Sequence, residues 1–162
     1  MNYRAIIEKI SSKMYELFLK FYYKDKICIK GKVLMRKGRF INISENGLLV
    51  IGDNCFFNNY CSINCKNKII IGDDCLFGEG VKIYDHNHKF YDTSLKIREQ
   101  GYSCDEIKIG NNCWIGSNVT ILKGVKIGNN VVIGANCLVY KSVPDNSIIK
   151  NDTQIHIEQL HT

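Results

Sequence analysis

The sequence has very little proline and no long hydrophobic run. One proline occurs in 162 residues, which excludes collagen-like and proline-rich low-complexity chains. No stretch reaches the roughly 18 uncharged apolar residues that a membrane-spanning helix needs. Because 45% of the residues are apolar, the chain can bury the core of a single domain. We therefore expect an ordered, soluble protein.

The chain also lacks a large excess of charge of either sign. The chain has 22 Lys and Arg against 16 Asp and Glu, a formal net charge of +6. The basic residues are spread along the chain instead of forming a block with interleaved aromatics, so nucleic acid is not an expected partner. A modest positive excess favours anionic partners such as phosphorylated cofactors, acidic polysaccharide or anionic lipid.

The eight cysteines include no CxxC pair, and the N-terminus lacks the apolar segment of a secretory signal. Charged residues interrupt that segment throughout: Arg4, Glu8, Lys9, Lys13, Glu16 and Lys20. A reducing cytoplasm is the simpler setting for such a chain.

Residues 1–24 predict an amphipathic helix. Apolar side chains recur every three to four residues at Ile6, Ile10, Met14, Leu17 and Phe21. We expect this stripe to pack on the domain that follows. The alternative is peripheral contact with a membrane surface, near the inner face and beside a lipid-linked substrate.

From about residue 51 the sequence repeats with a period of six, which decides the fold class. A six-residue period fits a solenoid whose short strands end in sharp turns, with Gly and Asn at slots two to four supplying positive φ. Three such sides close one triangular coil of 18 residues. The first-slot anchors are Ile109, Ile115, Ile121, Ile127, Ile133 and Val139, and the fifth slots hold Cys113, Val119, Val125, Val131, Cys137 and Val143.

The same pattern recurs upstream and explains most of the cysteines. It starts at Ile51 and again at Ile71, which predicts two further coils. Five cysteines fall at the inward fifth slot, where Cys acts as a compact hydrophobe. They are Cys55, Cys61, Cys75, Cys113 and Cys137.

Residues 85–105 contain no anchor series and interrupt the repeat. We predict that they form an external loop that leaves the solenoid after Tyr84. Long loops on a rigid scaffold commonly carry function.

This pattern resembles the left-handed parallel β-helix acyltransferases built from hexapeptide repeats, over roughly residues 45–148. Within them the chain is similar to the sugar and polysaccharide O-acetyltransferases, including the maltose and galactoside enzymes. The resemblance implies a mainly β fold, a left-handed parallel β-helix with a short N-terminal α-helix and an external loop. The β-helix domain would span 25–148 and the tail 149–162. The handedness comes from the resemblance alone, because general rules favour right-handed crossovers.

The resemblance also implies a catalytic histidine, carried by residues 81–88 just where the loop departs. Aligning the apolar positions puts this residue at His88, with His86 as the second candidate. An ordinary histidine, with a pKa of about 6.5, suits a general base that takes a proton from a sugar hydroxyl. Asp85, Asp92 or a backbone carbonyl are the candidates for orienting its ring.

Residues 112–119 and 124–128 are similar to the coils that border coenzyme A in this family. The resemblance implies acetyl-CoA as acyl donor and no metal, with Trp114 near the active site and Ser117 beside the cofactor. Lys123, Lys126 and Lys141 are candidates for its phosphates. Residues 149–154 lack the Gly and Pro of the family's usual closing turn, so no C-terminal cofactor contact is carried over.

On the acceptor side, the position of an Asn used by some sugar acetyltransferases falls at Tyr60, next to Asn59. Tyr84, Tyr91 and Arg98 are further candidates for binding a sugar or polysaccharide. The resemblance also implies a homotrimer with its sites between subunits.

Three alternatives stay open. One is N-acetylation of a nucleotide-linked amino sugar by the same general-base chemistry. Another is a non-catalytic scaffold or sugar-binding module. The third is a γ-type carbonic anhydrase, whose zinc would need three histidines, but besides His86 and His88 the chain has only His156 and His161, both in the tail.

Overall fold

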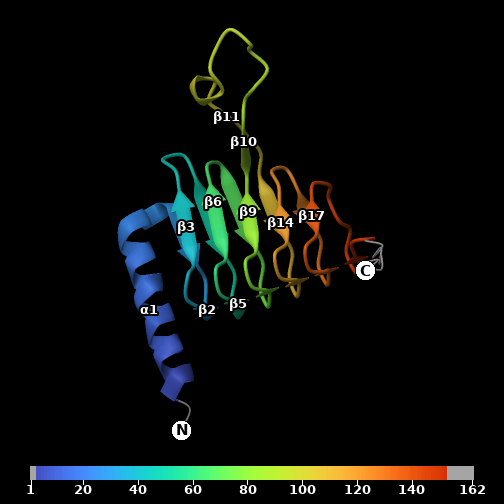
Figure 1. Ribbon diagram of the computed structural model, residues 1–162. Helices are drawn as coiled ribbons and strands as arrows, with labels where there is room; N and C mark the ends of the chain where they lie inside the picture. The colour runs from blue at the N-terminus through green and yellow to red at the C-terminus, as the bar shows by residue number, and fades with distance from the viewer. Residues whose placement is uncertain (1–2, 153–162) are drawn as a thin grey trace, which may run out of the picture.

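The computed structural model describes residues 3–152, which form an N-terminal helix followed by a solenoid of parallel strands (Figure 1). Helix α1 (Tyr3–Tyr23) and the short η1 (Lys24–Lys26) lead into the first coil. The strands build three parallel sheets along the solenoid. The predicted fold class, a left-handed parallel β-helix with an N-terminal helix and an external loop, is confirmed.

Each coil contributes one strand to each sheet. The first sheet contains β1 (Ile27–Ile29), β4 (Leu48–Ile51), β7 (Lys68–Ile71), β12 (Ile107–Ile109) and β15 (Lys126–Ile127). The second contains β2 (Val33–Met35), β5 (Cys55–Phe57), β8 (Leu76–Phe77), β13 (Trp114–Ile115), β16 (Val132–Ile133) and β18 (Ile148–Ile149). The third contains β3 (Phe40–Ile43), β6 (Ser62–Cys65), β9 (Lys82–Tyr84), β14 (Thr120–Ile121) and β17 (Leu138–Val139). Strand β18 ends one residue beyond the expected boundary at residue 148.

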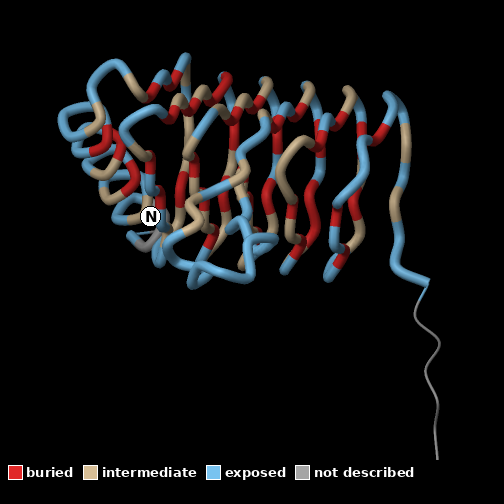
Figure 2. Tube along the Cα trace, turned by 90° about the horizontal axis from the view of Figure 1, so that it is seen from above, coloured by how far each residue is buried: buried red, intermediate tan, exposed pale blue. Residues whose placement is uncertain are grey.

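The hexapeptide slots explain this packing. First-slot anchors such as Ile109, Ile115 and Ile121 are at most 1% exposed, and Figure 2 shows buried residues recurring along every coil. Fourth-slot residues take up the positive φ that the turns require, as Asn112 does at 53° and Gly124 at 79°. Second-slot glycines serve a different purpose: a Cβ on Gly110 would lie 2.6 Å from the carbonyl oxygen of Gly128 in the next coil.

All five cysteines expected at the inward slot are buried, and Cys65, which the pattern did not assign, is buried with them. Their thiols do more than fill space. The Sγ of Cys75 lies 3.2 Å from the carbonyl oxygen of Gly110, and the Sγ of Cys113 lies 3.1 Å from that of Gly128. Each of these thiols, a weak hydrogen-bond donor, thus contacts the carbonyl oxygen of a glycine in the next coil.

Helix α1 packs against the first coil with the face opposite to the one expected. The expected inward stripe is exposed, from 39% at Ile6 to 80% at Phe21, whereas Leu19 is 1% exposed. The inward face is partly polar because the end of the solenoid offers backbone groups of β2. The Ser12 hydroxyl donates to the Val33 carbonyl at 3.3 Å and accepts from the Met35 N–H at 2.8 Å.

The loop of residues 85–105 is an ordered hairpin at its base. Strand β10 (His86–His88) pairs antiparallel with β11 (Tyr102–Cys104), and the single-turn η2 (Ile97–Glu99) lies toward its tip. The hairpin projects from the side of the solenoid (Figure 1). Strand β12 then pairs with β7, Ile109 opposite Ile71, so the loop is inserted into one coil.

Candidate active site

The hairpin is anchored by Asp85, a fully buried carboxylate at its base. It accepts hydrogen bonds from the backbone N–H groups of Lys66 at 2.8 Å and Asn67 at 2.7 Å, in the turn of the preceding coil. Its third partner is Nδ1 of His86, at 3.0 Å. Because a carboxylate only accepts, the His86 Nδ1 carries the proton in this pair.

His86 and His88 lie two residues apart on β10, so their side chains share one face of the hairpin. Both rings contact Tyr102 on β11, with ring centroids 5.3 Å apart for His86 and 4.5 Å for His88. The His86 side chain is 15% exposed, whereas His88 is an exposed residue. The structure therefore gives the carboxylate partner to His86 and the more open position to His88.

Lys66 completes this cluster and was missed in the sequence. Its Nζ lies 3.9 Å from the centroid of the Tyr102 ring, a cation–π contact. The available signal was the coil register: β6 and β9 pair with Asn64 opposite Tyr84. That register places the turn containing Lys66 directly against Asp85.

The loop candidates lie apart from the histidines. Asp92 accepts hydrogen bonds from the Ser94 N–H at 2.9 Å and from the Ser94 hydroxyl, and both residues belong to the loop. The ring of Tyr91 is tilted against that of Phe90, with centroids 4.3 Å apart, and Arg98 lies in η2. Of the two candidate carboxylates, Asp85 is the one in contact with a histidine.

The remaining candidates divide between the edges of the solenoid. Trp114 is 57% exposed on β13 of the second sheet, and the Ser117 hydroxyl accepts from the Glu79 N–H at 3.2 Å where the second sheet turns into the third. Asn59 and Tyr60 lie at that same edge, between β5 and β6. The histidines, with Tyr84 just before them, leave from the edge where the third sheet turns into the first. A single chain therefore does not bring Trp114 and Ser117 to the histidines.

The lysine candidates lie nearer the histidine edge. Lys123 and Lys141 occupy turns between the third and first sheets. A Cβ on Gly124 would lie 2.8 Å from a carboxylate oxygen of Asp105, at the end of the loop, so the turn that contains Lys123 lies against the base of the hairpin.

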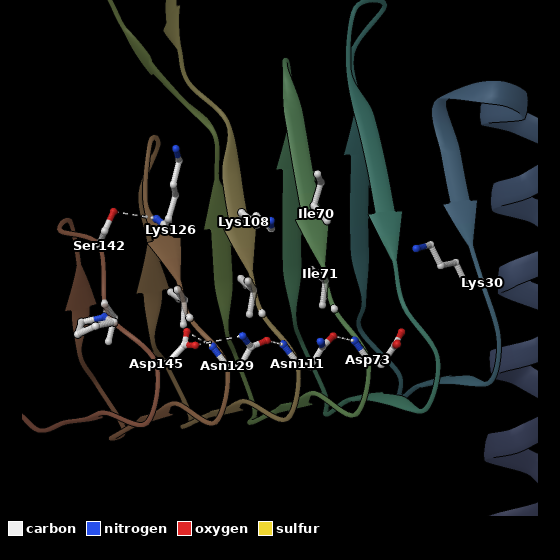
Figure 3. A pocket seen from close by; sticks show the side chains of 17 residues that line it. Lys30, Ile70, Ile71, Asp73, Lys108, Asn111, Lys126, Asn129, Ser142 and Asp145 are labelled. Carbon is white, nitrogen blue, oxygen red and sulfur yellow. Dashed lines mark hydrogen bonds between the residues drawn. The ribbon is translucent and has the colours of Figure 1, made fainter.

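A groove of about 780 Å³ runs along the first sheet and includes Lys126 (Figure 3). Lys30 and Lys108 also line it, so three lysines line one groove. Asp73, Asn111, Asn129 and Asp145 form a hydrogen-bonded ladder along its edge. The positive charge of the lysines suits the phosphates of coenzyme A. The carboxylates of Asp73 and Asp145 in the ladder make the opposite edge of the groove negative, so the positive charge lies on the side of the strands.

Comparison with known proteins identifies the repeat. The model of the bacterial transferase hexapeptide (six repeats) matches residues 106–141, and that of the hexapeptide repeat of succinyl-transferase matches residues 68–83. A putative lipopolysaccharide biosynthesis O-acetyl transferase of Escherichia coli, WbbJ, is 31% identical over 154 residues, covering 82% of this chain and 79% of the relative. The chain belongs to the hexapeptide-repeat acyltransferase family. The resemblance seen in the sequence is thereby confirmed.

Other similar proteins agree with this placement. A probable acetyltransferase of Mycobacterium tuberculosis is 33% identical over 118 residues, and the match spans 68% of this chain and 39% of that relative's length. A galactoside acetyltransferase in complex with coenzyme A superposes with a TM-score of 0.71 at 29% identity, covering 84% of this chain and 64% of that one. An acetyltransferase of Vibrio cholerae complexed with acetyl-CoA gives a TM-score of 0.70 at 26% identity, covering 85% and 71%.

Proposed function

We propose that this protein transfers an acetyl group from acetyl-CoA to a hydroxyl of a sugar or bacterial surface polysaccharide. The observation that carries the proposal is the pair His86 and His88 on one face of β10, with the buried carboxylate of Asp85 beneath it. The relatives support the reaction class, since one is named as a putative O-acetyl transferase and two solved neighbours hold coenzyme A or acetyl-CoA.

His88 is the proposed general base. Its ring is exposed at the face of the hairpin, where an acceptor hydroxyl can reach it. Acetyl-CoA supplies the thioester carbonyl that the acceptor oxygen attacks. A neutral His88 ring nitrogen takes the hydroxyl proton as that oxygen attacks, and the resulting imidazolium returns the proton to the leaving thiolate. His88 therefore ends the reaction in its starting protonation state, and no covalent intermediate with the protein is needed.

His86 is proposed to position this base. Asp85 fixes its ring, and His86 and His88 contact the same Tyr102 ring, so the hairpin face is held as one unit. One observation favours exchanging the two roles: the carboxylate that would stabilise an imidazolium lies on His86. Comparing the two alanine variants distinguishes these assignments.

We infer that acetyl-CoA is bound on the lysine side of the histidine edge. Lys123 and Lys141 share that edge, and Lys126 lines the adjoining groove with Lys30 and Lys108. These residues supply positive charge for the phosphates. Trp114 and Ser117 would reach the same cofactor only from a second copy of the chain, because they lie on another side of their own coil.

A homotrimer is therefore part of the proposal, and the second sheet offers the surface for it. Its outward side chains form one apolar row, in which Leu76 is 50% exposed, Trp114 57% and Ile148 66%. In the proposed trimer this row packs against the edge of the next copy. Each contact then joins two different surfaces, head to tail, and three such contacts close a ring. Strand register aligns the row as Leu34, Phe56, Leu76, Trp114, Val132 and Ile148.

The acceptor is proposed to bind over the loop. Tyr91 and Arg98 are exposed in it, and Tyr102 lies beside the histidines. Aromatic rings and a guanidinium suit stacking on, and hydrogen bonding to, a sugar. We place the reaction in the cytoplasm, because all eight cysteines are free thiols and free thiols suit a reducing compartment.

The test is mass spectrometry of a panel of bacterial sugars and oligosaccharides incubated with acetyl-CoA and the native protein. We expect one acceptor to gain an acetyl group that mild base removes, which identifies an ester. An acetyl group that resists mild base would identify an amide and move the assignment to N-acetylation. A protein that modifies no acceptor and does not bind coenzyme A in calorimetry would contradict the proposal.

A further inference from the structure

The exposed side of α1 is mainly apolar. Among the helix residues whose burial is described, every exposed side chain is aliphatic, aromatic or lysine. Nine large apolar side chains are exposed, which we call the outer helix face: Tyr3, Ile6, Ile7, Ile10, Met14, Leu17, Phe18, Phe21 and Tyr22. At 3.6 residues per turn they cover an arc of about 160°. These side chains form one continuous apolar surface, whereas exposed apolar residues on an ordinary protein surface are scattered singly.

The position of α1 leaves this face without cover from the described part of the chain. The helix lies across the N-terminal end of the solenoid (Figure 1), and Leu19 and Ser12 face the first coil. The outer helix face is on the opposite side, so it points away from the coils. Tyr23, at the end of the helix, also bonds back to the solenoid through the Ile41 carbonyl at 3.0 Å.

The charges of the helix are sorted in the same way. Lys9, Lys13 and Lys20 are exposed along one border of the outer helix face. Glu16 is buried on the inner side, where it pairs with Lys13 at 3.0 Å and Lys20 at 2.7 Å. Glu8 pairs with Arg36 of the solenoid at 3.3 Å. The border of the apolar face is therefore net positive, and the acidic groups are turned inward.

We propose that α1 docks the protein on an anionic membrane surface, with the outer helix face at the boundary between headgroups and acyl chains. An apolar face bordered by lysines matches both layers of such a surface, acyl chains for the apolar side chains and anionic headgroups for the ammonium groups. A second copy packed antiparallel on the same face would instead bring the two rows of lysines to the same side. Among residues 3–152 no helix is long and apolar enough to cross a bilayer. This inference concerns binding alone and does not rest on acetyl transfer.

The test is co-sedimentation of the full chain with vesicles of phosphatidylcholine, with and without phosphatidylglycerol. The outer-face variant is Leu17→Glu, and its matched control is Leu138→Glu on the third sheet. These leucines are 57% and 56% exposed, so both changes place a carboxylate at an equally exposed site. We expect the native chain and Leu138→Glu to bind the anionic vesicles, and Leu17→Glu to bind about tenfold more weakly.

Two controls make the outcome decisive. Met14→Glu, at a position 66% exposed, repeats the test if Leu17→Glu does not fold, as judged by circular dichroism. Light scattering without vesicles reports whether either substitution changes the molar mass. Equal binding of native and outer-face variants, or no native binding to anionic vesicles, would overturn the inference. So would a fall in molar mass on substitution, because the face would then cover another protein.

Discussion

The carboxylate of Asp85 lies 3.0 Å from Nδ1 of His86 while two backbone N–H groups of the preceding coil bond to the same carboxylate. This arrangement connects the solenoid to the hairpin that carries both histidines. The carboxylate satisfies the donors of the turn at residues 66 and 67 and at the same time fixes the ring that follows it. Scaffold stability and the geometry of the histidine pair therefore depend on one side chain.

Asp85→Asn should destabilise the fold. The amide keeps the shape, but it loses the charge and offers N–H groups where N–H donors already point. We expect a loss of about 1–3 kcal/mol in the free energy of unfolding, measured by urea denaturation. Asp92→Asn is the control: Asp92 is exposed in the loop, so its substitution should change stability by no more than about 0.5 kcal/mol. Equal unfolding midpoints for native protein and Asp85→Asn would show that the buried bonds contribute nothing.

Leu76→Glu should break the assembly. Leu76 lies within the apolar row of the second sheet and is 50% exposed in one chain, so contact with another copy would bury it and would exclude a carboxylate. We expect light scattering to give the mass of three chains for the native protein and of one chain for Leu76→Glu. Leu138→Glu, on the third sheet, should retain the native mass. A native monomer, or a Leu76→Glu variant that stays assembled, would refute this interface.

Thiol labelling should separate the cysteines into two groups. Cys28 and Cys104 are exposed and the other six are buried. Burial shields these six from the reagent, and it raises the pKa of the Cys61 thiol to about 11 and that of Cys65 to about 12, so little thiolate forms at these two sites. With iodoacetamide at pH 8 we expect two labels on the native chain and eight after unfolding, counted by intact mass. Rapid native labelling of Cys61 would contradict its place in the core.

The same pKa shifts predict a loss of stability at high pH. The folded state holds the protons of Cys61 and Cys65 until about pH 11 and 12, whereas an unfolded thiol releases its proton near pH 9. Because the native state binds more protons between these values, the free energy of unfolding falls as pH rises above about 9, by roughly 1 kcal/mol per thiol at pH 10. Urea midpoints at pH 8 and 10 measure this fall. Cys61→Ala should reduce it and Cys28→Ser should not; an unchanged slope in Cys61→Ala would refute the link to burial.

The repeat made the coils from Ile51 onward predictable, because each residue type there serves one slot. Ile109 fills the interior, Asn112 takes the positive φ and Cys113 fits the small inward position. The first coil was not readable in this way. Ile29, Met35 and Ile41 keep the six-residue spacing and are buried, and Gly38 takes the positive φ of a fourth slot. The pattern is hidden because Lys32 stands at the fourth slot of the first turn and Arg39 at the fifth slot of the second.

Two features depended on contacts that no local pattern carries. The outward orientation of Phe21 on α1 follows from Ser12 and Tyr23 bonding to backbone groups of the solenoid, while the apolar stripe alone predicted the reverse. The contact between Asp85 and His86 depends on which turn lies beneath the hairpin, and that is set by strand register. The roles of His88, Trp114 and Ser117 remain predictions from family resemblance.

The most direct test is turnover of His88→Ala and His86→Ala with acetyl-CoA and the acceptor found in the panel. The proposed roles predict that His88→Ala loses about two to four orders of magnitude in kcat, with coenzyme A affinity little changed, while His86→Ala loses much less. The fall in kcat at low pH, where protonation disables a general base, should be lost only in His88→Ala. A larger loss in His86→Ala would transfer the base to His86, and near-native turnover in His88→Ala would contradict the assignment.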